Sequence, residues 1–273
     1  MTEAPESSAV SSDRPTSAGI YDVYLGGANH SVVERETAAK LRELLPDVEA
    51  MAWANRSFHQ RVTRWLAEQG VRQFIDLGAG LPTQDNTHQV AQRVAAEAKV
   101  VYVDIDPRTA AAGRGLLADS ANAAVVMADL CEPERVLGSR EVRELIDFEQ
   151  PVGLICTAVL HFIGDEKDPF GVIRTYMDAL PSGSYLALTH ITADKQPSGP
   201  VKAISGIYRG AGEMIYFRSR ELVDLFFAGL DLEPPYENAD PKLTFMGIWG
   251  CEDPEEADDD VGRWAYAGVA RKP

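Results

Sequence analysis

The chain has few cysteines, no long apolar run and a shortage of positive charge. Its three cysteines, Cys131, Cys156 and Cys251, lie far apart and form no CxxC pair. The sequence therefore supports neither a disulfide framework nor a zinc cluster, and buried reduced thiols are the simpler interpretation. No apolar run approaches the roughly 20 residues that a membrane span needs. The first 14 residues also lack a basic start followed by an apolar stretch. We therefore expect no signal peptide, no membrane partner and a cytoplasmic location.

The charge balance argues against a nucleic-acid partner. The chain has 42 Asp and Glu against 26 Lys and Arg, a net charge of −16. Seven of the acidic residues lie between positions 252 and 260 with no basic residue among them, and −16 less these seven leaves −9. Nucleic-acid binding depends on clustered Lys and Arg, which this composition does not favour. The acidic run itself is typical of a solvated loop.

The chain divides into three parts by composition. Residues 1–17 are rich in Ser, Pro and Thr with almost no large apolar side chains, which predicts a flexible tail. Residues 18–70 show helical periodicity and predict a helical extension that could act as a lid. Residues 71–273 carry the rest of the apolar pattern and are expected to form the ligand-binding domain.

Short apolar runs alternate with helical segments from Val71 onward. This βαβ rhythm is typical of a parallel sheet that is covered on both faces. Two further runs follow near the C-terminus, separated only by the acidic loop, and predict an antiparallel pair. The expected fold is an α/β domain with a mostly parallel seven-stranded sheet and an antiparallel C-terminal strand. The expected strands are residues 73–78, 99–105, 123–129, 153–160, 184–191, 244–250 and 263–271.

The first strand ends in a glycine-rich loop that predicts a cofactor site. Gly78, Ala79 and Gly80 follow this strand, and Asp76 precedes them by two residues. Two glycines one residue apart let the backbone turn tightly and approach a ligand closely. The next helix then directs its N-terminal amides toward that ligand. A dinucleotide fingerprint has a third glycine at the position that Thr83 occupies here, which disfavours NAD(P).

The second strand ends in an acid at the spacing expected for a ribose contact. Asp104 lies 24 residues after Gly80, close to the roughly 20 residues seen in nucleotide-binding βαβ units. Its carboxylate could accept hydrogen bonds from two ribose hydroxyls. Asp106 is a competing candidate for the same role.

Six motifs distributed over the chain carry a resemblance to a known family. They are YDVYLGGANH (21–30), NRSFHQR (55–61), FIDLGAGLPTQDNTHQVAQ (74–92), VVYVDIDP (100–107), ADLCEP (128–133) and AVLHFI (158–163). With these motifs, nearly the whole chain resembles an actinobacterial family of S-adenosyl methyltransferases, formerly a domain of unknown function, within the class I superfamily of S-adenosylmethionine-dependent methyltransferases. The family usually has a Lys after its paired glycines, whereas this sequence has Ala28, Asn29 and His30.

The resemblance implies a Rossmann-like fold and S-adenosylmethionine as the cofactor. It places the glycine loop at the amino-acid end of the cofactor, Asp104 at the ribose and Asp129 at the adenine amino group. The residues expected to bind the cofactor are Asp76, Gly78, Ala79, Gly80, Asp104, Ile105, Asp129, Leu130 and Thr157.

Catalytic and substrate residues are less well defined by the sequence. Methyl transfer needs alignment, exclusion of water and in some cases a base. His161, just past the fourth strand, is the first candidate for a base or substrate contact, and a structural role at a helix start is the alternative. The five histidines show no ligand spacing, so no metal is expected. The candidate substrate and lid residues are Tyr21, Tyr24, Asn29, His30, Asn55, Arg56 and His190.

The sequence thus predicts an S-adenosylmethionine-dependent methyltransferase that acts on a small-molecule acceptor. Two alternatives stay open at this point. One is a non-catalytic module that binds S-adenosylmethionine or S-adenosylhomocysteine, because no base is securely identified. The other is an NAD(P)-dependent oxidoreductase, which shares the βαβ start. The acceptor and the oligomeric state cannot be read from the sequence.

Overall fold

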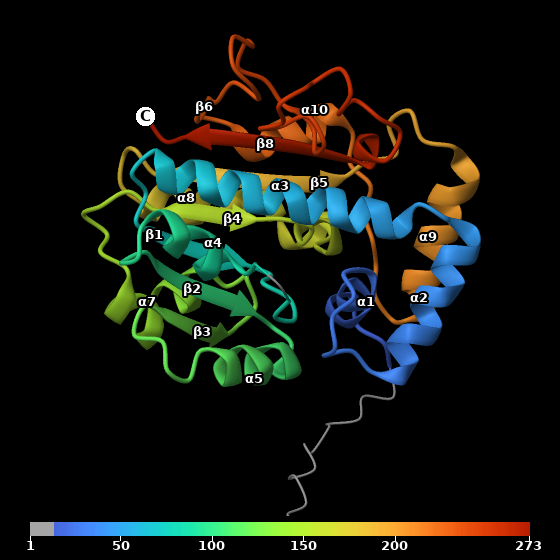
Figure 1. Cartoon of the computed structure of the whole chain (residues 1–273), viewed down its shortest axis with the longest axis horizontal. Helices are drawn as coiled ribbons and strands as arrows, with labels where there is room; N and C mark the ends of the chain where they lie inside the picture. The colour runs from blue at the N-terminus through green and yellow to red at the C-terminus, as the bar shows by residue number, and fades with distance from the viewer. Residues whose placement is uncertain (1–13, 84) are drawn as a thin grey trace, which may run out of the picture.

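The structure is a computed structural model that describes residues 14–83 and 85–273. Most of the predicted tail, residues 1–13, lies outside the described residues. The remainder is built around one mixed sheet with helices on both faces and a separate group of helices at one end (Figure 1).

Five parallel strands form the body of the sheet in the order β3-β2-β1-β4-β5. They are β1 (Gln73–Leu77), β2 (Lys99–Asp104), β3 (Ala123–Met127), β4 (Gly153–Cys156) and β5 (Tyr185–Ile191). β8 (Ala265–Arg271) pairs with β5 in antiparallel register over its whole length. This is the Rossmann-like sheet that the sequence predicts, with the predicted antiparallel strand at its C-terminal end.

Over the residues that the structure describes, the sheet has eight strands where seven were expected. The extra strand, β6 (Asp231–Leu232), pairs two residues with the end of β8. The expected strand at 244–250 is reduced to β7 (Thr244–Phe245), which also pairs with β8. The chain turns after Met246, and Gly247 lies so close to the Ala257 carbonyl that a Cβ would stand 2.7 Å from its oxygen. Edge strands this short leave no periodic apolar pattern in the sequence.

Apolar side chains fill both faces of the sheet, as a covered parallel sheet requires. On one face Phe74 packs in a core with residues of α3 (Val48–Glu68), including Phe58 and Leu66. On the other face Ile75 packs with Tyr176 of α8 (Pro169–Ala179). The other helices around the sheet are α4 (Thr87–Val94), α5 (Pro107–Leu116), α6 (Pro133–Leu137), α7 (Arg140–Leu145) and α10 (Arg220–Asp224), with short 3-10 turns η1 (Leu160–Phe162), η2 (Asp165–Lys167), η3 (Leu225–Phe227) and η4 (Gly262–Trp264).

The helical extension lies beyond the carboxyl ends of the parallel strands (Figure 1). It consists of α1 (Ser17–Tyr24), α2 (Val32–Leu44) and the long α3, which continues across the sheet. α1 contacts both α2 and α3. Thr16, which the sequence analysis groups with the tail, caps α1 by accepting a hydrogen bond from Gly19 N.

A helix from the distant C-terminal half completes this group. α9 (Ser198–Gly210) contacts α2 and lies beside it in Figure 1. Its sequence carries Pro200 and three glycines, which lower intrinsic helix propensity and obscure the helical pattern. The helix therefore depends on its tertiary contacts and was not predicted.

Candidate active site

A cavity of about 720 Å³ lies between the carboxyl ends of the parallel strands and the helices α1, α2, α3 and α9. Three of the residues predicted from the sequence lie outside its lining, namely Asn29, His30 and His190. The predicted residues that line it are Tyr21, Tyr24, Asn55, Arg56, Asp76, Gly78, Ala79, Gly80, Asp104, Ile105, Asp129, Leu130, Thr157 and His161.

The glycine loop is held by the neighbouring strand. The amides of Gly78 and Ala79 both donate to the Val103 carbonyl, at 2.8 and 3.1 Å. Gly78 has a φ of +69°, and a Cβ there would stand 2.2 Å from Cγ2 of Val159. At Gly80, with a φ of +67°, a Cβ would meet no described atom within 4 Å. Gly78 is therefore required by packing and by backbone conformation, whereas Gly80 leaves space open at the cavity.

Asp104 connects the end of β2 to this loop. Its Oδ2 accepts from Gly80 N at 2.8 Å, and its Oδ1 accepts from Asp106 N at 2.9 Å. Burial raises the pKa of Asp104 above its ordinary value. Asp106, the competing candidate, is the N-cap of α5 and accepts from Arg108 N at 2.8 Å. This arrangement keeps the Asp104 carboxylate fixed at the cavity wall and gives Asp106 a capping role.

Asp129, just after β3, offers a second acidic group at the cavity. Ile105, just after β2, offers an apolar surface there. Asp129 Oδ1 accepts from Cys131 N at 2.9 Å, and Oδ2 accepts from Lys167 at 3.1 Å. Burial opposes ionisation of Asp129, but these two hydrogen bonds outweigh it and lower its pKa. Ile105, after β2, lines the cavity while its surface is 65% exposed. An apolar side chain left exposed beside carboxylates suits a flat, partly polar ligand.

Asp76 belongs to a buried polar chain that the sequence analysis did not predict. Thr87 Oγ1 donates to its Oδ2 at 2.5 Å, and His59 of α3 lies between Thr87 and Thr157 at 2.8 Å from each hydroxyl. Burial raises the pKa of Asp76 to about 6. His59 and Thr87 stand within the quoted motifs, but no spacing rule assigns them a function. Only the packing of α3 across the strand ends brings them together.

Asn55 links the long helix to α1. Thr189 donates to Asn55 Oδ1 at 2.6 Å, and Asn55 Nδ2 donates to the Tyr21 hydroxyl at 2.8 Å. The Tyr21 hydroxyl in turn donates to the Ala52 carbonyl at 3.0 Å. The neighbouring Arg56 donates to the Asp85 carbonyl at 3.0 Å and lines the cavity. Asn55 thus holds Tyr21 in place, while Arg56 supplies positive charge near the glycine loop.

His161 lies in η1 and only 8% of its surface is exposed. Burial, together with the nearby His190 and Arg218, lowers its pKa well below the ordinary value, so the ring is neutral at neutral pH. Among residues 14–83 and 85–273, no hydrogen-bond partner is found for its Nδ1. His161 therefore offers a neutral, hydrogen-bonding ring at the wall of the cavity.

His190 has a supporting position behind that wall. Its Nδ1 donates to the Ile191 carbonyl at 2.8 Å, and its Nε2 accepts from Arg218 at 2.7 Å. Arg218 also donates to the carbonyl of Leu160, at 3.1 Å. Burial lowers the pKa of His190 to about 3. His190 and Arg218 thus fix the backbone that carries His161.

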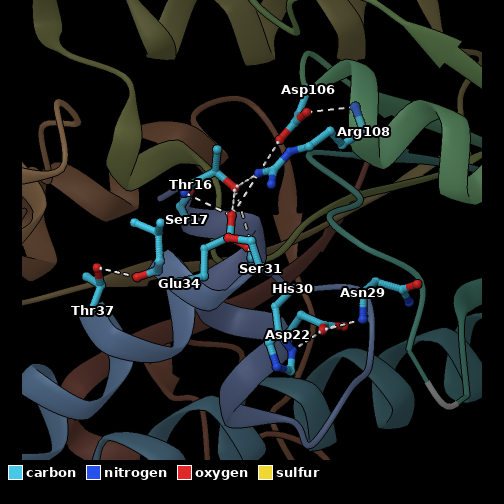
Figure 2. Close-up of polar contacts among 12 residues, drawn as sticks. Thr16, Ser17, Asp22, Asn29, His30, Ser31, Glu34, Thr37, Asp106 and Arg108 are labelled. Atoms are coloured by element: carbon cyan, nitrogen blue, oxygen red, sulfur yellow. Dashed lines mark hydrogen bonds and ion pairs between the residues drawn. The ribbon is translucent and has the colours of Figure 1, made fainter. Parts of the chain in front are cut away.

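Two polar clusters fasten the helical extension to the loops of the cofactor site (Figure 2). In the first, Asp22 Oδ2 accepts from Asn29 N at 3.0 Å and lies 2.8 Å from His30 Nδ1. Gly27 packs against the same carboxylate so closely that a Cβ at this position would stand 2.0 Å from Asp22 Oδ1. Asn29 Nδ2 then donates to the Pro82 carbonyl at 2.9 Å. Asn29 therefore attaches the loop after α1 to Pro82, just beyond the glycine loop, while His30 fastens the same loop to Asp22 of α1.

The second cluster joins α1, α2 and α5. Arg108 Nη2 donates to Glu34 Oε1 at 2.8 Å and contacts Thr16 Oγ1 at 2.7 Å. The Glu34 side chain is fully buried, and it also accepts from Ser31 N at 2.6 Å. Figure 2 shows Arg108 reaching from α5 toward this carboxylate. The cluster holds the start of α1 against the end of β2.

The half of the cavity farthest from the strand ends is lined mainly by apolar side chains. Leu41 and Met51 contribute from α2 and α3, and Ile204 and Tyr208 from α9. Trp249 packs edge-to-face on Phe58 in the core. Ile204 of α9 was not predicted to line the cavity.

No group of three or more His, Cys, Asp or Glu side chains in residues 14–83 and 85–273 is placed to hold a metal ion. Within these ranges, no helix is long and apolar enough to cross a membrane.

The mostly parallel sheet, with a glycine loop and carboxylates at the carboxyl ends of its strands, forms a Rossmann-like site for a nucleotide-containing cofactor. The sequence matches the family described as S-adenosyl methyltransferase over residues 3–273. The chain therefore belongs to this family: it is an S-adenosylmethionine-dependent methyltransferase, and S-adenosylmethionine is its cofactor.

Solved structures agree with this assignment. A DUF574 family protein from Streptomyces avermitilis is 35% identical, with 96% of this chain and 98% of that chain covered and a TM-score of 0.88. A candidate methyltransferase from Thermobifida fusca is 36% identical, with 95% of each chain covered and a TM-score of 0.85. The plantazolicin methyltransferase BpumL, solved with S-adenosylhomocysteine, is 8% identical at a TM-score of 0.50 and shares the fold alone. No protein with a curated description matches the chain.

Proposed function

We propose that the cavity binds S-adenosylmethionine along the strand ends and a small, largely apolar methyl acceptor in the half built by the helices. The proposal rests on the lining of the cavity. The lining carries the glycine loop and the acidic residues at the strand ends, and it is mainly apolar where the helices contribute. Its volume of about 720 Å³ lies within the roughly 300–1,000 Å³ of small-molecule sites. The acidic balance of −16 supports an acceptor other than a nucleic acid. A cytoplasmic location belongs to the same proposal.

The hydrogen-bond acceptors at the strand ends fit the cofactor. Its ribose hydroxyls and adenine amino group are hydrogen-bond donors, and Asp104 and Asp129 are buried or half-buried carboxylates at successive strand ends. Its adenine ring has apolar faces, and Ile105 offers an exposed apolar surface beside Asp104. Its amino-acid end carries both charges, which match the Asp76 carboxylate and the Arg56 guanidinium on the cavity wall. Ala79, Leu130 and Thr157 complete the proposed cofactor site.

When bound, the cofactor supplies an electrophilic methyl group on its sulfonium. The chain supplies alignment and exclusion of water, which account for much of such a transfer. We assign the exclusion of water to residues 18–70, because α1 covers the cavity with Tyr21 and Tyr24 and is held by both polar clusters.

His161 is the proposed acceptor contact. Its neutral ring can accept a hydrogen bond from an N–H or O–H group of the acceptor. Because burial keeps its pKa well below the ordinary value, it is a weak base, and its role is to orient the acceptor more than to remove a proton.

Calorimetric titration with S-adenosylmethionine and S-adenosylhomocysteine tests the cofactor half. We expect Asp104→Asn to weaken both ligands by about ten- to a hundredfold, because a charged acceptor of ribose hydrogen bonds is lost. Asp231→Asn, exposed in β6, is the matched control and should bind as the wild type does. If the Asp104 variant binds both ligands normally, the placement of the cofactor is wrong.

The acceptor half is tested by measuring S-adenosylhomocysteine formation with three acceptor panels. These contain apolar small molecules, peptides and nucleic acids. Turnover confined to peptides or nucleic acids would contradict the proposed acceptor class.

A further inference from the structure

A buried chain of hydrogen bonds joins two walls of the cavity through the helical extension. It begins at Asp76 on β1, continues through Thr87 at the start of α4 and His59 of α3, and ends at Thr157 after β4. The distances are 2.5, 2.8 and 2.8 Å in that order. Asp76, Thr87 and His59 are 4%, 1% and 3% exposed. Groups this deeply buried keep fixed hydrogen-bond partners.

The direction of every hydrogen bond in this chain follows from its acidic end. Thr87 Oγ1 donates to Asp76 Oδ2 at 2.5 Å, which commits the single hydroxyl hydrogen of Thr87 to the carboxylate. Thr87 can then only accept from His59, and the hydrogen of His59 must be on Nε2. Burial keeps the His59 ring neutral by lowering its pKa well below the ordinary value. Its Nδ1 is therefore an acceptor, and Thr157 must donate to it.

Asp76 and Thr157, the two ends of this series of hydrogen bonds, both face the cavity as hydrogen-bond acceptors. Asp76 and Thr157 line the cavity, and the Thr157 hydroxyl has committed its hydrogen to His59. Of the two Asp76 oxygens, Oδ2 is the one that accepts from Thr87 in this series of hydrogen bonds. Two acceptors, one of them charged, favour a ligand group that is positively charged and has several N–H bonds. A primary ammonium is such a group.

We propose that His59 is a positioning residue that keeps the Thr157 hydroxyl turned as an acceptor for the ammonium of the cofactor's amino-acid end. The proposal rests on the cofactor placement given under the proposed function. His59 does not touch the ligand itself. Because Thr87 donates to Asp76, the His59 ring donates from Nε2 to Thr87 and accepts at Nδ1 from Thr157. The long helix α3 therefore contributes to cofactor selection as well as to the lid.

The test compares two ligands that differ in the amino-acid end. S-Adenosylhomocysteine carries the ammonium, whereas 5′-methylthioadenosine keeps the adenine, ribose and sulfur and lacks it. We expect Thr157→Val to weaken S-adenosylhomocysteine about tenfold, the loss expected for one charge-assisted hydrogen bond. Binding of 5′-methylthioadenosine should change less than about threefold, and Thr157→Ser, which keeps the hydroxyl, should bind both ligands normally.

Two variants of His59 separate its positioning role from packing. His59→Phe removes both ring nitrogens and should reproduce the selective loss seen with Thr157→Val. His59→Asn can still accept from Thr157 and should recover most of the affinity for S-adenosylhomocysteine. Should His59→Phe fail to fold, the two Thr157 variants and the tautomer of the His59 ring still test whether His59 positions the Thr157 hydroxyl.

The tautomer is read by nitrogen NMR of histidine-labelled wild-type protein. The proposal requires a neutral ring with its hydrogen on Nε2, and a hydrogen on Nδ1 would overturn it. Equal losses for both ligands in Thr157→Val, or no loss at all, would also overturn it. If neither ligand binds the wild type, the proposed cofactor placement has failed instead, and the tautomer result still stands separately.

Discussion

Removing Arg108 should release the N-terminal helices from the cofactor domain. Arg108 donates at 2.8 Å to Glu34, whose side chain is 0% exposed while that of Arg108 is 17% exposed. Arg108→Ala leaves a buried carboxylate that keeps its hydrogen bonds from Thr16 and Ser31. A hydrogen bond between charged groups contributes about 1.5–3 kcal/mol, and stranding a buried charge costs about 3–5 kcal/mol. Because the remaining donors compensate in part, we expect a loss of about 2–3 kcal/mol in the free energy of unfolding.

The pH dependence of this loss provides a second signature. Burial favours the protonated form of Glu34, but hydrogen bonds from Arg108, Ser31 and Thr16 outweigh it, and the pKa lies below the ordinary value of 4.5. A depressed pKa contributes stability that is present above the unfolded-state pKa and is lost as the pH falls through the folded-state pKa. Without Arg108 the pKa of Glu34 rises. Protonation of Glu34 at low pH then removes the buried charge and its cost in the variant. The difference between wild type and variant should therefore shrink as the pH falls from about 7 to about 4.

Urea unfolding at both pH values and a double-mutant cycle with Glu34→Gln measure these effects. Amide hydrogen exchange should show the added opening concentrated in α1 and α2. Arg140→Ala, which breaks an exposed pair with Glu144, is the control and should leave the unfolding midpoint unchanged. A loss below about 0.5 kcal/mol for Arg108→Ala, or a loss that does not depend on pH, would refute this account of the cluster.

Two further predictions concern the glycine loop and the thiols. Gly78→Ala should destabilise the protein by about 2–4 kcal/mol in urea unfolding, because left-handed strain adds to a clash with Val159. Gly80→Ala carries the strain alone and should cost about 1–2 kcal/mol, and an equal cost for both would contradict the packing argument. Burial, together with Asp129, raises the pKa of Cys131 to about 11, so its alkylation rate should still be rising above pH 9. A rate that levels off at an ordinary thiol pKa would show that Cys131 is solvated.

Local sequence features were enough to select residues that the fold brings together at one cavity. A strand that carries Asp76 near its end and a loop with Gly78 and Gly80 are found in few kinds of ligand site, because each feature meets a local backbone requirement. Parallel strands place their carboxyl ends at one edge of the sheet, which brings Asp104 and Asp129 to the same cavity. Whether these residues bind the cofactor as proposed stays a prediction.

In the helical extension, the sequence could not show which side chains of the motif at residues 21–30 face the cavity. Tyr21 and Tyr24 line the cavity as expected of a lid, whereas Asn29 and His30 from the same motif fasten the loop outside it. Spacing identifies the loop as unusual, but it cannot show which side chains turn inward. That choice depends on Asp22, whose buried carboxylate holds the loop from within.

The sequence by itself determined the βαβ order, the glycine loop and the acids at the strand ends, because these follow from local periodicity and backbone chemistry. The tertiary structure alone decided which distant helices close the cavity. α9 joins α2 although its glycines weaken its helical pattern, and His59 of α3 meets Thr157 across 98 residues of sequence. Contacts of this kind arise from the packing of whole elements, and no local pattern encodes the partner that each element will find.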